Sequence, residues 1–390
     1  MAPRRSRLAG AFVVLGLVLA LASCGGHSAR QPTRPIVRRT TIDIYASLPL
    51  HGIWAAQGTS VLNGVKLALA QAAHRAGTWR VHLVAFDDSA GAAKVAQDAR
   101  VASTDPAAVY YIGELDSAAS QISAPILNAA GLPQVSPLST ALSGSGRTLD
   151  PTGRPSFLRL APSDGVQAGA QLGELAHRGC RGVAVVHDDT LEGTGLASLL
   201  QAKRGQYGVR IARVEPLTDP VRLAARLKTQ GDDCIVFAGA ATAEAATLLG
   251  DLLPGRVRLL LGSYGGCTEP LTRLLPLAAR AVFRCTLPLG NLAASAAGRG
   301  FVTAYRTAYG GAFDPLAAYG YEAMRLGLDL IAALGGRGDD KSAVRSALFA
   351  LRTRTSMLGT YGFTRTGSST LKAYGVYRVG ASGEPVFAGR

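Results

Sequence analysis

Motifs of the common enzyme classes are missing from this 390-residue chain. It has no G-x-S-x-G nucleophile elbow, no P-loop and no G-x-G-x-x-G after the first expected strand, which argues against a serine hydrolase and against a nucleotide cofactor. The chain contains only 6 His and 5 Cys, and their spacing does not resemble a zinc site, which needs close His or Cys pairs. The sequence therefore favours binding over catalysis, with no cofactor and no metal.

Acidic residues are also few: the chain has 26 Asp and Glu but 41 Lys and Arg, which gives a formal net charge of +15. The excess comes from scattered Arg, and no stretch interleaves basic and aromatic residues as a nucleic-acid groove would. The composition, 17% charged and 48% hydrophobic, is typical of a globular protein. We expect a solvated basic surface, suited to lying near anionic lipid, and no nucleic-acid partner.

Long apolar runs are absent after the N-terminus, where Leu8–Leu21 is shorter than the roughly 20 residues of a membrane helix. Three Arg residues precede this run, and Leu21-Ala22-Ser23-Cys24 closes it. A basic start, a short apolar core and small residues indicate a secretory signal. A Cys after Leu-Ala-Ser resembles the bacterial lipobox, in which cleavage before the Cys is coupled to its lipidation. We expect a signal peptide over residues 1–23, a lipid-modified Cys24 and a polar tether over 24–40; an ordinary signal with a chance Cys is the alternative.

From Thr41 onward, short apolar segments alternate with amphipathic segments of helical period. This alternation predicts an α/β fold built from doubly wound parallel sheets. The expected strands are Ile42–Ser47, Val81–Phe86, Val109–Gly113, Pro133–Ser136, Phe157–Ala161, Gly182–His187, Val209–Val214, Cys234–Gly239, Arg256–Gly262 and Ala281–Leu287. The last hundred residues are expected to be mostly helical, with turns and strands over 359–379.

A Gly/Pro-rich loop at 143–156 interrupts the alternation, which then restarts. We therefore predict two lobes, joined by hinge strands near 157–162 and 283–289, with a cleft between them. The first lobe would comprise 41–157 with 288–358, and the second 158–287 with 359–390.

Hydroxyl residues follow two neighbouring strands of the first lobe. Asp116 and Ser117 come after one strand, and Ser136–Thr140 ends the next and leads on from it. Helix N-termini at the carboxyl edge of a parallel sheet offer unpaired N–H groups and a positive dipole end, which suit a carboxylate. The alternative is that these residues only cap helices.

Taken together, these features resemble the solute-binding proteins of branched-chain amino-acid ABC transporters, which have the type I periplasmic-binding fold. The resemblance covers about residues 41–380. It is carried by Leu48–Gly64, Phe86-Asp87-Asp88, Ile112-Gly113, Ser136-Pro137 with Ser139-Thr140, Val186-His187-Asp188 and Tyr319–Glu322.

The resemblance implies a lipid-anchored receptor on the extracytoplasmic face of the cell membrane. Its lobes would close around a small polar ligand, such as an amino acid, and present it to ABC permease subunits. The first alternative is a regulatory lipoprotein of the same fold without a transported ligand, such as a cell-wall synthase activator. A lipoprotein hydrolase is disfavoured by the missing motifs.

In the first lobe, the resemblance places the ligand's carboxylate against Ser117 and Thr140. The Leu138 carbonyl and the Thr140 hydroxyl would face an ammonium group, with Ser139 in the same loop. Trp54 and Gln57 would form a wall of the pocket.

The second lobe departs from the family pattern. Glu192, or Leu191 in another register, replaces one aromatic residue, and Ala240 and Ala241 replace an aromatic pair. Tyr264 stands where the family places an acid against the ammonium. An unpaired buried ammonium costs about 3–5 kcal/mol. Either Glu192 or Asp116 replaces that acid, or the ligand is not a simple branched-chain amino acid.

Four cysteines remain beyond Cys24, and an even number in an exported chain favours disulfides. Three pairings are possible, and the spacing does not choose among them. If the strand assignment holds, Cys180 and Cys234 lie at the amino edge of the second sheet, and Cys267 and Cys285 lie toward its carboxyl edge. Crossed pairs would then span roughly 15–20 Å, which a disulfide cannot do. We therefore expect Cys180–Cys234 and Cys267–Cys285, with four reduced thiols as the alternative.

Overall fold

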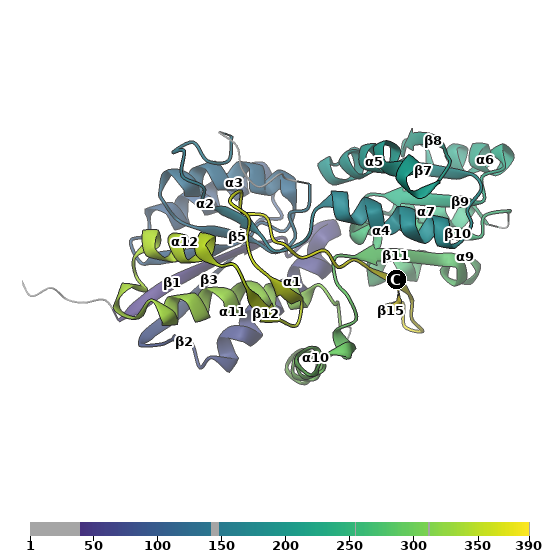
Figure 1. Ribbon diagram of the computed structural model, residues 1–390. Coiled ribbons are helices and arrows are strands. Elements are labelled where there is room, and N and C mark those ends of the chain that lie inside the picture. The colour runs from purple at the N-terminus through teal and green to yellow at the C-terminus, as the bar shows by residue number, and fades with distance from the viewer. Residues whose placement is uncertain (1–39, 142–147, 254, 311–312, 390) are drawn as a thin grey trace, which may run out of the picture. The chain divides into compact units, whose positions relative to one another are not determined.

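A computed structural model describes residues 40–141, 148–253, 255–310 and 313–389 (Figure 1). The expected signal peptide, Cys24 and all of the tether except Thr40 lie outside the described residues. None of the helices in the described ranges is long and apolar enough to cross a membrane.

The first sheet has six strands in the order β2-β3-β1-β4-β5-β6. Its pairs are parallel except for the β2–β3 hairpin, which the sequence did not predict. The strands are β1 (Thr41–Leu48), β2 (Arg75–Ala76), β3 (Trp79–Asp87), β4 (Ala108–Ile112), β5 (Gln134–Ser136) and β6 (Phe157–Arg159).

Helices cover both faces of this sheet, as the alternation of buried side chains along the strands requires (Figure 1). Ile42 and Ile44 of β1 belong to the main core with α1 and α11, whereas Tyr45 points to the opposite face, which α2 and α3 cover. The helices of this lobe are α1 (Ala55–Gln71), α2 (Ala92–Thr104), α3 (Ser117–Ala129), α11 (Ala317–Ala333) and α12 (Lys341–Ala350). A short 3-10 helix, η1 (Gly52–Trp54), leads into α1.

The second sheet has seven strands in the order β15-β14-β11-β10-β9-β7-β8. Its five-stranded centre is parallel, as expected, and β14 and β15 extend it in antiparallel fashion. The strands are β7 (Val183–His187), β8 (Ile211–Pro216), β9 (Cys234–Ala238), β10 (Leu259–Gly262), β11 (Phe283–Leu287), β14 (Gly375–Val379) and β15 (Pro385–Gly389).

The second sheet is also covered on both faces. Val183 and Val185 of β7 pack with α4 and α5, and Ala184 and Val186 face the core that contains α6 and α7. The helices that follow β6 are α4 (Asp164–His177), α5 (Leu191–Lys203), α6 (Pro220–Gln230), α7 (Ala243–Asp251), α8 (Glu269–Leu274), α9 (Leu277–Val282) and α10 (Ala296–Tyr309). Short 3-10 turns are η2 (Arg204–Tyr207), η3 (Tyr264–Gly266), η4 (Leu292–Ala294) and η5 (Gly335–Arg337). Ala281 was predicted in a strand but lies in α9, which the sequence did not predict.

Two features cross the predicted lobe boundaries. β6 pairs with β5 through Arg159, so the first sheet extends beyond residue 157. A hairpin of β12 (Arg354–Ser356) and β13 (Gly359–Tyr361) spans the predicted boundary at 358. The Tyr361 hydroxyl donates to Glu322 of α11 at 2.6 Å, which ties this hairpin to the first lobe. The division of the chain into lobes otherwise stays a prediction.

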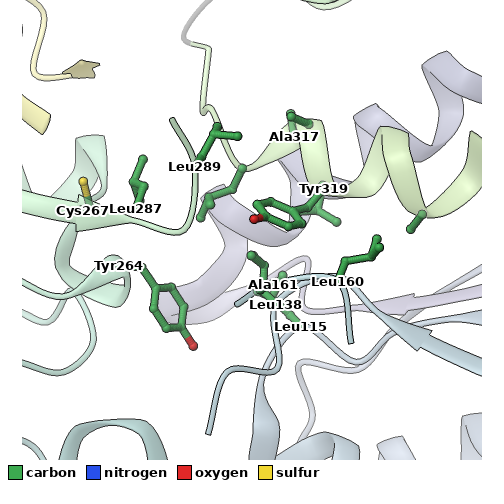
Figure 2. Packing of buried hydrophobic residues seen from close by; sticks show 14 of the residues in the cluster. Leu115, Leu138, Leu160, Ala161, Tyr264, Cys267, Leu287, Leu289, Ala317 and Tyr319 are labelled. Atoms are coloured by element: carbon green, nitrogen blue, oxygen red, sulfur yellow. The ribbon is translucent and has the colours of Figure 1, made fainter. Parts of the chain in front are cut away.

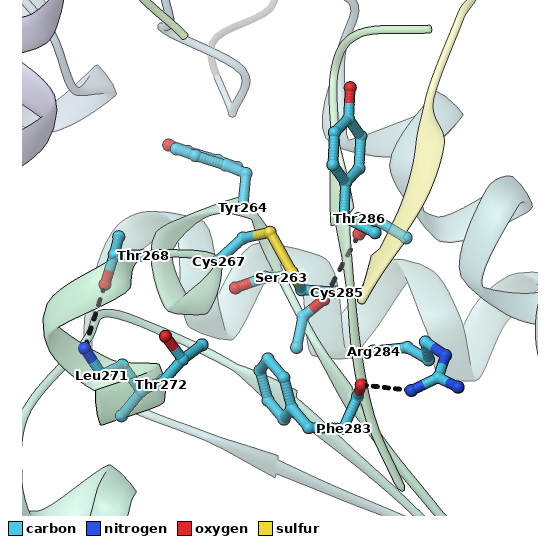
Figure 3. The surroundings of a disulfide bond; sticks show 12 residues. Ser263, Tyr264, Cys267, Thr268, Leu271, Thr272, Phe283, Arg284, Cys285 and Thr286 are labelled. Atoms are coloured by element: carbon cyan, nitrogen blue, oxygen red, sulfur yellow. Dashed lines mark hydrogen bonds between the residues drawn. A yellow bond between two sulfur atoms is a disulfide. The ribbon is translucent and has the colours of Figure 1, made fainter. Parts of the chain in front are cut away.

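Both expected disulfides are present. Cys180 bonds to Cys234 with a Cα–Cα distance of 5.9 Å, and Cys267 bonds to Cys285 with a Cα–Cα distance of 5.4 Å. The second joins the turn that carries Tyr264 to strand β11 (Figure 3). This disulfide therefore anchors a loop that the sequence had assigned to the ligand site.

Candidate functional site

Loops at the carboxyl ends of β1, β4 and β5 carry the residues that the sequence had singled out in the first lobe. Trp54 follows β1, Ser117 opens α3 after β4, and Thr140 follows β5. Because β1, β4 and β5 are neighbouring parallel strands, these loops emerge at one edge of the sheet.

The N-terminus of α3 accepts an anion, but that anion comes from the protein itself. The Ser117 backbone N–H donates to the Glu192 carboxylate at 2.7 Å, across 75 residues of sequence. Glu192 lies in the first turn of α5, which Thr190 caps through its side chain. The glutamate thus takes the position in which the sequence placed a ligand's carboxylate.

Asp116 is the N-cap of α3, and its side chain accepts from the Ala119 N–H at 2.8 Å. Ser139 is fully buried, and its hydroxyl bonds to those of Ser120 at 2.7 Å and Ser136 at 2.8 Å. Leu138 is fully buried in the main core (Figure 2). These three residues hold the two loops in shape, so the alternative reading of capping residues describes Asp116 well.

The first-lobe loops contact the second lobe at several points. The Gln57 side chain donates from Nε2 to the backbone oxygen of Tyr264 at 3.2 Å, and the Ser117–Glu192 bond is the second contact. The ring of Trp54 lies so close to Gly265 that a Cβ built there would be 3.1 Å from the tryptophan Cη2. Trp54 and Gln57 therefore lie against the turn of Tyr264, and their role as a wall of the ligand pocket stays a prediction.

A small cavity lies among these contacts. It is lined by Trp54, Asp164, Gln167, Thr190, Glu192, Leu196, Gly239, Ala240, Ser263, Tyr264 and Gly265. Its volume is about 10 Å³, at the lower limit for a single water molecule. A ligand larger than water therefore enters only if these walls separate.

Several buried polar atoms around this cavity have no hydrogen-bond partner. They are Gln57 Oε1, Thr140 Oγ1, both carboxylate oxygens of Asp164, Gln167 Oε1 and the Tyr264 hydroxyl. Figure 2 shows the Tyr264 hydroxyl pointing away from Cys267 and Leu287 of its own lobe. Because a buried polar group without a partner costs about 1–3 kcal/mol, such a cluster is typical of a binding site.

Burial also perturbs the acids of the site. It raises the pKa of Asp164 to about 7, and the negative charge of Glu192 adds to this effect, whereas Thr140 and Arg159 oppose it. Burial raises the pKa of Glu192, helped by the charge of Asp116 and opposed by the Ser117 N–H. The pKa of Tyr264 is raised well above its usual value, first by burial and then by the charges of Glu192 and Asp164.

Asp164 and Gln167 are the residues that the sequence analysis missed. Both lie in the first turn of α4. Asp164 is 3% exposed, and its N–H donates to the Thr140 carbonyl, which also accepts from Arg159 Nη1. The signal was available, because Ser163-Asp164 after an apolar strand is a typical helix start.

The arrangement can bind but offers no metal site, because no group of three or more His, Cys, Asp or Glu side chains among the described residues could hold an ion. The loops of the second lobe are fixed by Asp188, whose carboxylate accepts from Thr190 and from the Ala240 N–H at 2.7 Å. Ala240 therefore lines the cavity with a methyl group, where the resemblance implies an aromatic ring.

The model of the periplasmic binding protein family matches residues 41–384 of this chain. Solved structures are similar over nearly the whole described fold, and no curated protein sequence matches. A leucine-binding protein, LivK, from Thermotoga maritima is 23% identical with a TM-score of 0.76, over 89% of this chain and 97% of that one.

Two further structures carry bound ligands. The branched-chain amino-acid transporter substrate-binding protein LivJ from Streptococcus pneumoniae, in complex with isoleucine, is 20% identical with a TM-score of 0.76, over 89% of this chain and all of that one. A solute-binding protein of an ABC transporter from Rhodopseudomonas palustris, in complex with benzoate, is 17% identical with a TM-score of 0.76, over 90% of this chain and 96% of that one.

Proposed function

This chain belongs to the periplasmic binding protein family, and we propose that it is the extracytoplasmic solute receptor of an ABC importer. Its two lobes close around a small polar ligand and present it to the permease subunits. One observation carries the proposal: Trp54 of the first lobe and residues of the second lobe line a single cavity, and Asp164, Gln167 and Tyr264 hold buried polar atoms there without partners. Similar structures that hold isoleucine or benzoate support the importer role.

The proposed ligand-contacting residues are Trp54, Gln57, Ser117, Thr140, Glu192 and Tyr264, with Asp164 and Gln167 added from the cavity lining. Asp116, Leu138 and Ser139 support the loops that hold them. A hinge between lobes of this kind absorbs closure with little repacking.

We also propose that Cys24 is lipidated and anchors the receptor to the outer face of the membrane. The basis is the Leu21-Ala22-Ser23-Cys24 sequence after a short apolar run. Replacing Cys24 by Ala should release the protein from the membrane fraction into the soluble fraction. Unchanged retention in membranes would contradict the anchor.

A second candidate is a regulatory protein of the same fold without a transported ligand. The Glu192–Ser117 bond favours it, because the protein satisfies its own anion site and leaves a cavity of only about 10 Å³. Such a protein would signal through lobe closure without a solute.

A thermal-shift screen with amino acids, amides, aromatic acids, amines, peptides and sugars separates the two candidates. A ligand at 100 times its Kd adds about 2.7 kcal/mol of stability, which raises the melting temperature measurably. A specific shift, abolished in a Tyr264→Ala variant, supports the receptor. No shift with any compound supports the regulatory protein.

A further inference from the structure

The cavity between Trp54, Asp164, Glu192 and Tyr264 carries acceptors and negative charge, and its lining contains no Lys, Arg or His. From this arrangement we infer that the solute is a small organic cation, an amine or ammonium compound without a carboxylate, held by Asp164 and Glu192 against the two aromatic rings. This inference rests on the proposed receptor function and names the class of its ligand.

The first observation concerns the anion site. Two loops at the edge of the first sheet would suit a ligand carboxylate, but the Ser117 N–H is already bonded to Glu192 at 2.7 Å. A ligand with a carboxylate would have to displace Glu192 and place a second negative charge beside it. Two carboxylates side by side repel each other strongly in a buried site.

The second observation concerns Asp164, whose two carboxylate oxygens lack hydrogen-bond partners although the residue is only 3% exposed. The Thr140 hydroxyl and the charge of Arg159 lower the pKa of Asp164, but the Arg159 guanidinium donates from Nη1 to the Thr140 carbonyl at 2.8 Å. A buried carboxylate that lacks a bonded partner is stabilised by an incoming cation.

The third observation concerns two side-chain amides whose N–H groups donate to other groups of the protein. Gln167 lines the cavity and donates from Nε2 to Thr286 at 2.9 Å, which leaves its buried Oε1 without a partner. Gln57 lies beside the cavity, donates from Nε2 to the Tyr264 carbonyl and is left with an unpartnered Oε1 as well. A ligand that satisfies these oxygens must itself be a hydrogen-bond donor. An ammonium group has up to three N–H donors and no acceptor, as a Lys side chain shows.

The fourth observation concerns the aromatic rings that line the cavity. Trp54 and Tyr264 both line the cavity, and faces of such rings attract organic cations by about 0.5–2 kcal/mol. The lining thus combines carboxylates, acceptor oxygens and aromatic surface, which together select for positive charge.

Matched probes test this inference by calorimetry on the purified protein. Benzylamine and 3-methylbutan-1-amine carry the cation; benzyl alcohol and 3-methylbutan-1-ol are neutral counterparts of the same shape; benzoate and leucine carry a carboxylate. We expect at least one amine to bind at least tenfold tighter than its alcohol and its carboxylate counterpart.

Variants show which side chains contribute to amine binding. Asp164→Asn should weaken amine binding at least tenfold, whereas Asp189→Asn, an exposed acid outside the cavity lining, should leave it unchanged. Glu192→Ala should weaken amine binding and improve benzoate or leucine binding at least tenfold, because it frees the Ser117 N–H. Melting temperatures of all variants show whether each is folded.

Amine binding should also weaken between pH 8 and pH 5, as Asp164 takes up a proton. The groups that face Asp164 are Glu192 of α5, Arg159 of β6, Thr140, Tyr264 and Tyr374. In the Asp164→Asn variant this pH dependence should shrink.

Each outcome decides between the proposals. Tight binding of leucine or benzoate with no amine binding would overturn the inference and leave the receptor function standing. Amine binding that Asp164→Asn does not weaken would also overturn it. Failure of every probe to bind would overturn the inference, and the wider thermal-shift screen would then decide on the receptor function separately.

Discussion

Thr140 illustrates how a single side chain can be held ready for a ligand. Its Oγ1 is buried without a partner, while its carbonyl accepts from two donors. We predict that Thr140→Val leaves the free energy of unfolding unchanged within about 0.5 kcal/mol, because its hydroxyl meets the Asp164 and Tyr264 side chains without a hydrogen bond of ordinary geometry. The same variant should bind the ligand found in the screen about tenfold more weakly, the value of one hydrogen bond.

Thr190→Val is the matched control in the same cavity. The Thr190 hydroxyl caps α5 by accepting from the Gly193 N–H at 3.0 Å. Losing this cap should cost about 1 kcal/mol in urea denaturation. Equal destabilisation of both variants would show that Thr140 has a structural role.

Asp164 should give the protein a particular pH dependence of stability. Its pKa is raised from 3.8 to about 7, chiefly by burial. Between these values the folded chain holds a proton that the unfolded chain has lost, so the free energy of unfolding falls as the pH rises from about 4 to 7. Asp164→Asn should reduce that fall by at least about 1.4 kcal/mol, the value of one pKa unit.

Denaturant titrations at pH 4.5, 5.5, 6.5 and 7.5 measure this effect. The exposed Asp189→Asn variant should keep the wild-type fall. A fall that is identical in the Asp164→Asn variant would mean that this carboxyl is ionised in the folded protein.

At the residue scale, sequence patterns located the loops better than the roles within them. Hydroxyl residues after two apolar strands correctly indicated a polar edge of the sheet. Local spacing cannot tell a cap from a ligand contact, so Asp116 was assigned to the site although it caps α3. Asp164 was missed because its burial depends on packing against Thr140 and Glu192, residues far from it in sequence or in another element.

Among the elements, α1 and α11 pack closely through glycines. A Cβ on Gly320 would lie 1.9 Å from the Val61 carbonyl oxygen, and a Cβ on Gly64 would lie 2.1 Å from that of Ala317. Both contacts involve backbone, which cannot move aside cheaply. We predict that Gly320→Ala destabilises the protein by about 3 kcal/mol or more in chemical denaturation, as overpacking does.

Gly300 in the middle of α10 is the control, because nothing lies within 4 Å of a Cβ built on it. Gly300→Ala should therefore stabilise the protein by up to about 1 kcal/mol through helix propensity. If both changes lowered the free energy of unfolding by similar amounts, the close contact between α1 and α11 would not be the cause of the destabilisation.

The two disulfides of the second lobe close loops of different length. Cys180 and Cys234 are 54 residues apart, and Cys267 and Cys285 are 18 apart. Chain entropy predicts stabilisation of about 4 kcal/mol for the longer loop and about 3 kcal/mol for the shorter. Paired Cys→Ala variants should lose stability in that order, as measured by guanidinium denaturation.

Loss of the Cys267–Cys285 bond should have a second effect, because that bond holds the turn of Tyr264 (Figure 3). Its paired variant should bind ligand more weakly, whereas the Cys180–Cys234 pair, at the other edge of the sheet, should affect stability alone. Free thiols in the exported wild-type protein would contradict both expectations.

Element prediction succeeded where the hydrophobic period was uniform. The central parallel strands β7, β9, β10 and β11 have continuous apolar sequences and were assigned within a few residues. Ala281 was placed in a strand because the apolar run continues through it from α9 into β11. The antiparallel strand β15 was missed, since its pairing with β14 is decided by the sheet edge and not by its own pattern.

At the scale of the whole molecule, the residues through which the two lobes contact each other are also residues of the proposed site. Gln57, Ser117 and Trp54 of the first lobe each contact the second lobe at Tyr264, Glu192 and Gly265. Under the proposed function, a ligand that binds there would compete for some of these contacts and replace them with its own. Lobe closure and ligand binding would then be coupled through the same few atoms.

We predict that removing two cross-lobe hydrogen bonds opens the ligand-free protein. Gln57→Ala combined with Glu192→Ala deletes bonds that each contribute about 0.5–1.5 kcal/mol, enough to shift an open–closed equilibrium by roughly 5- to 150-fold. Small-angle X-ray scattering should then show a radius of gyration above the roughly 20 Å of a compact chain of this size. As a control, Glu215→Ala removes an ion pair with Arg226 inside the second lobe and should leave the radius unchanged. If the double variant scatters like the wild type, these two bonds do not hold the lobes together, and closure depends on other contacts, such as those of Trp54 with Gly265 and of Thr140 with Asp164.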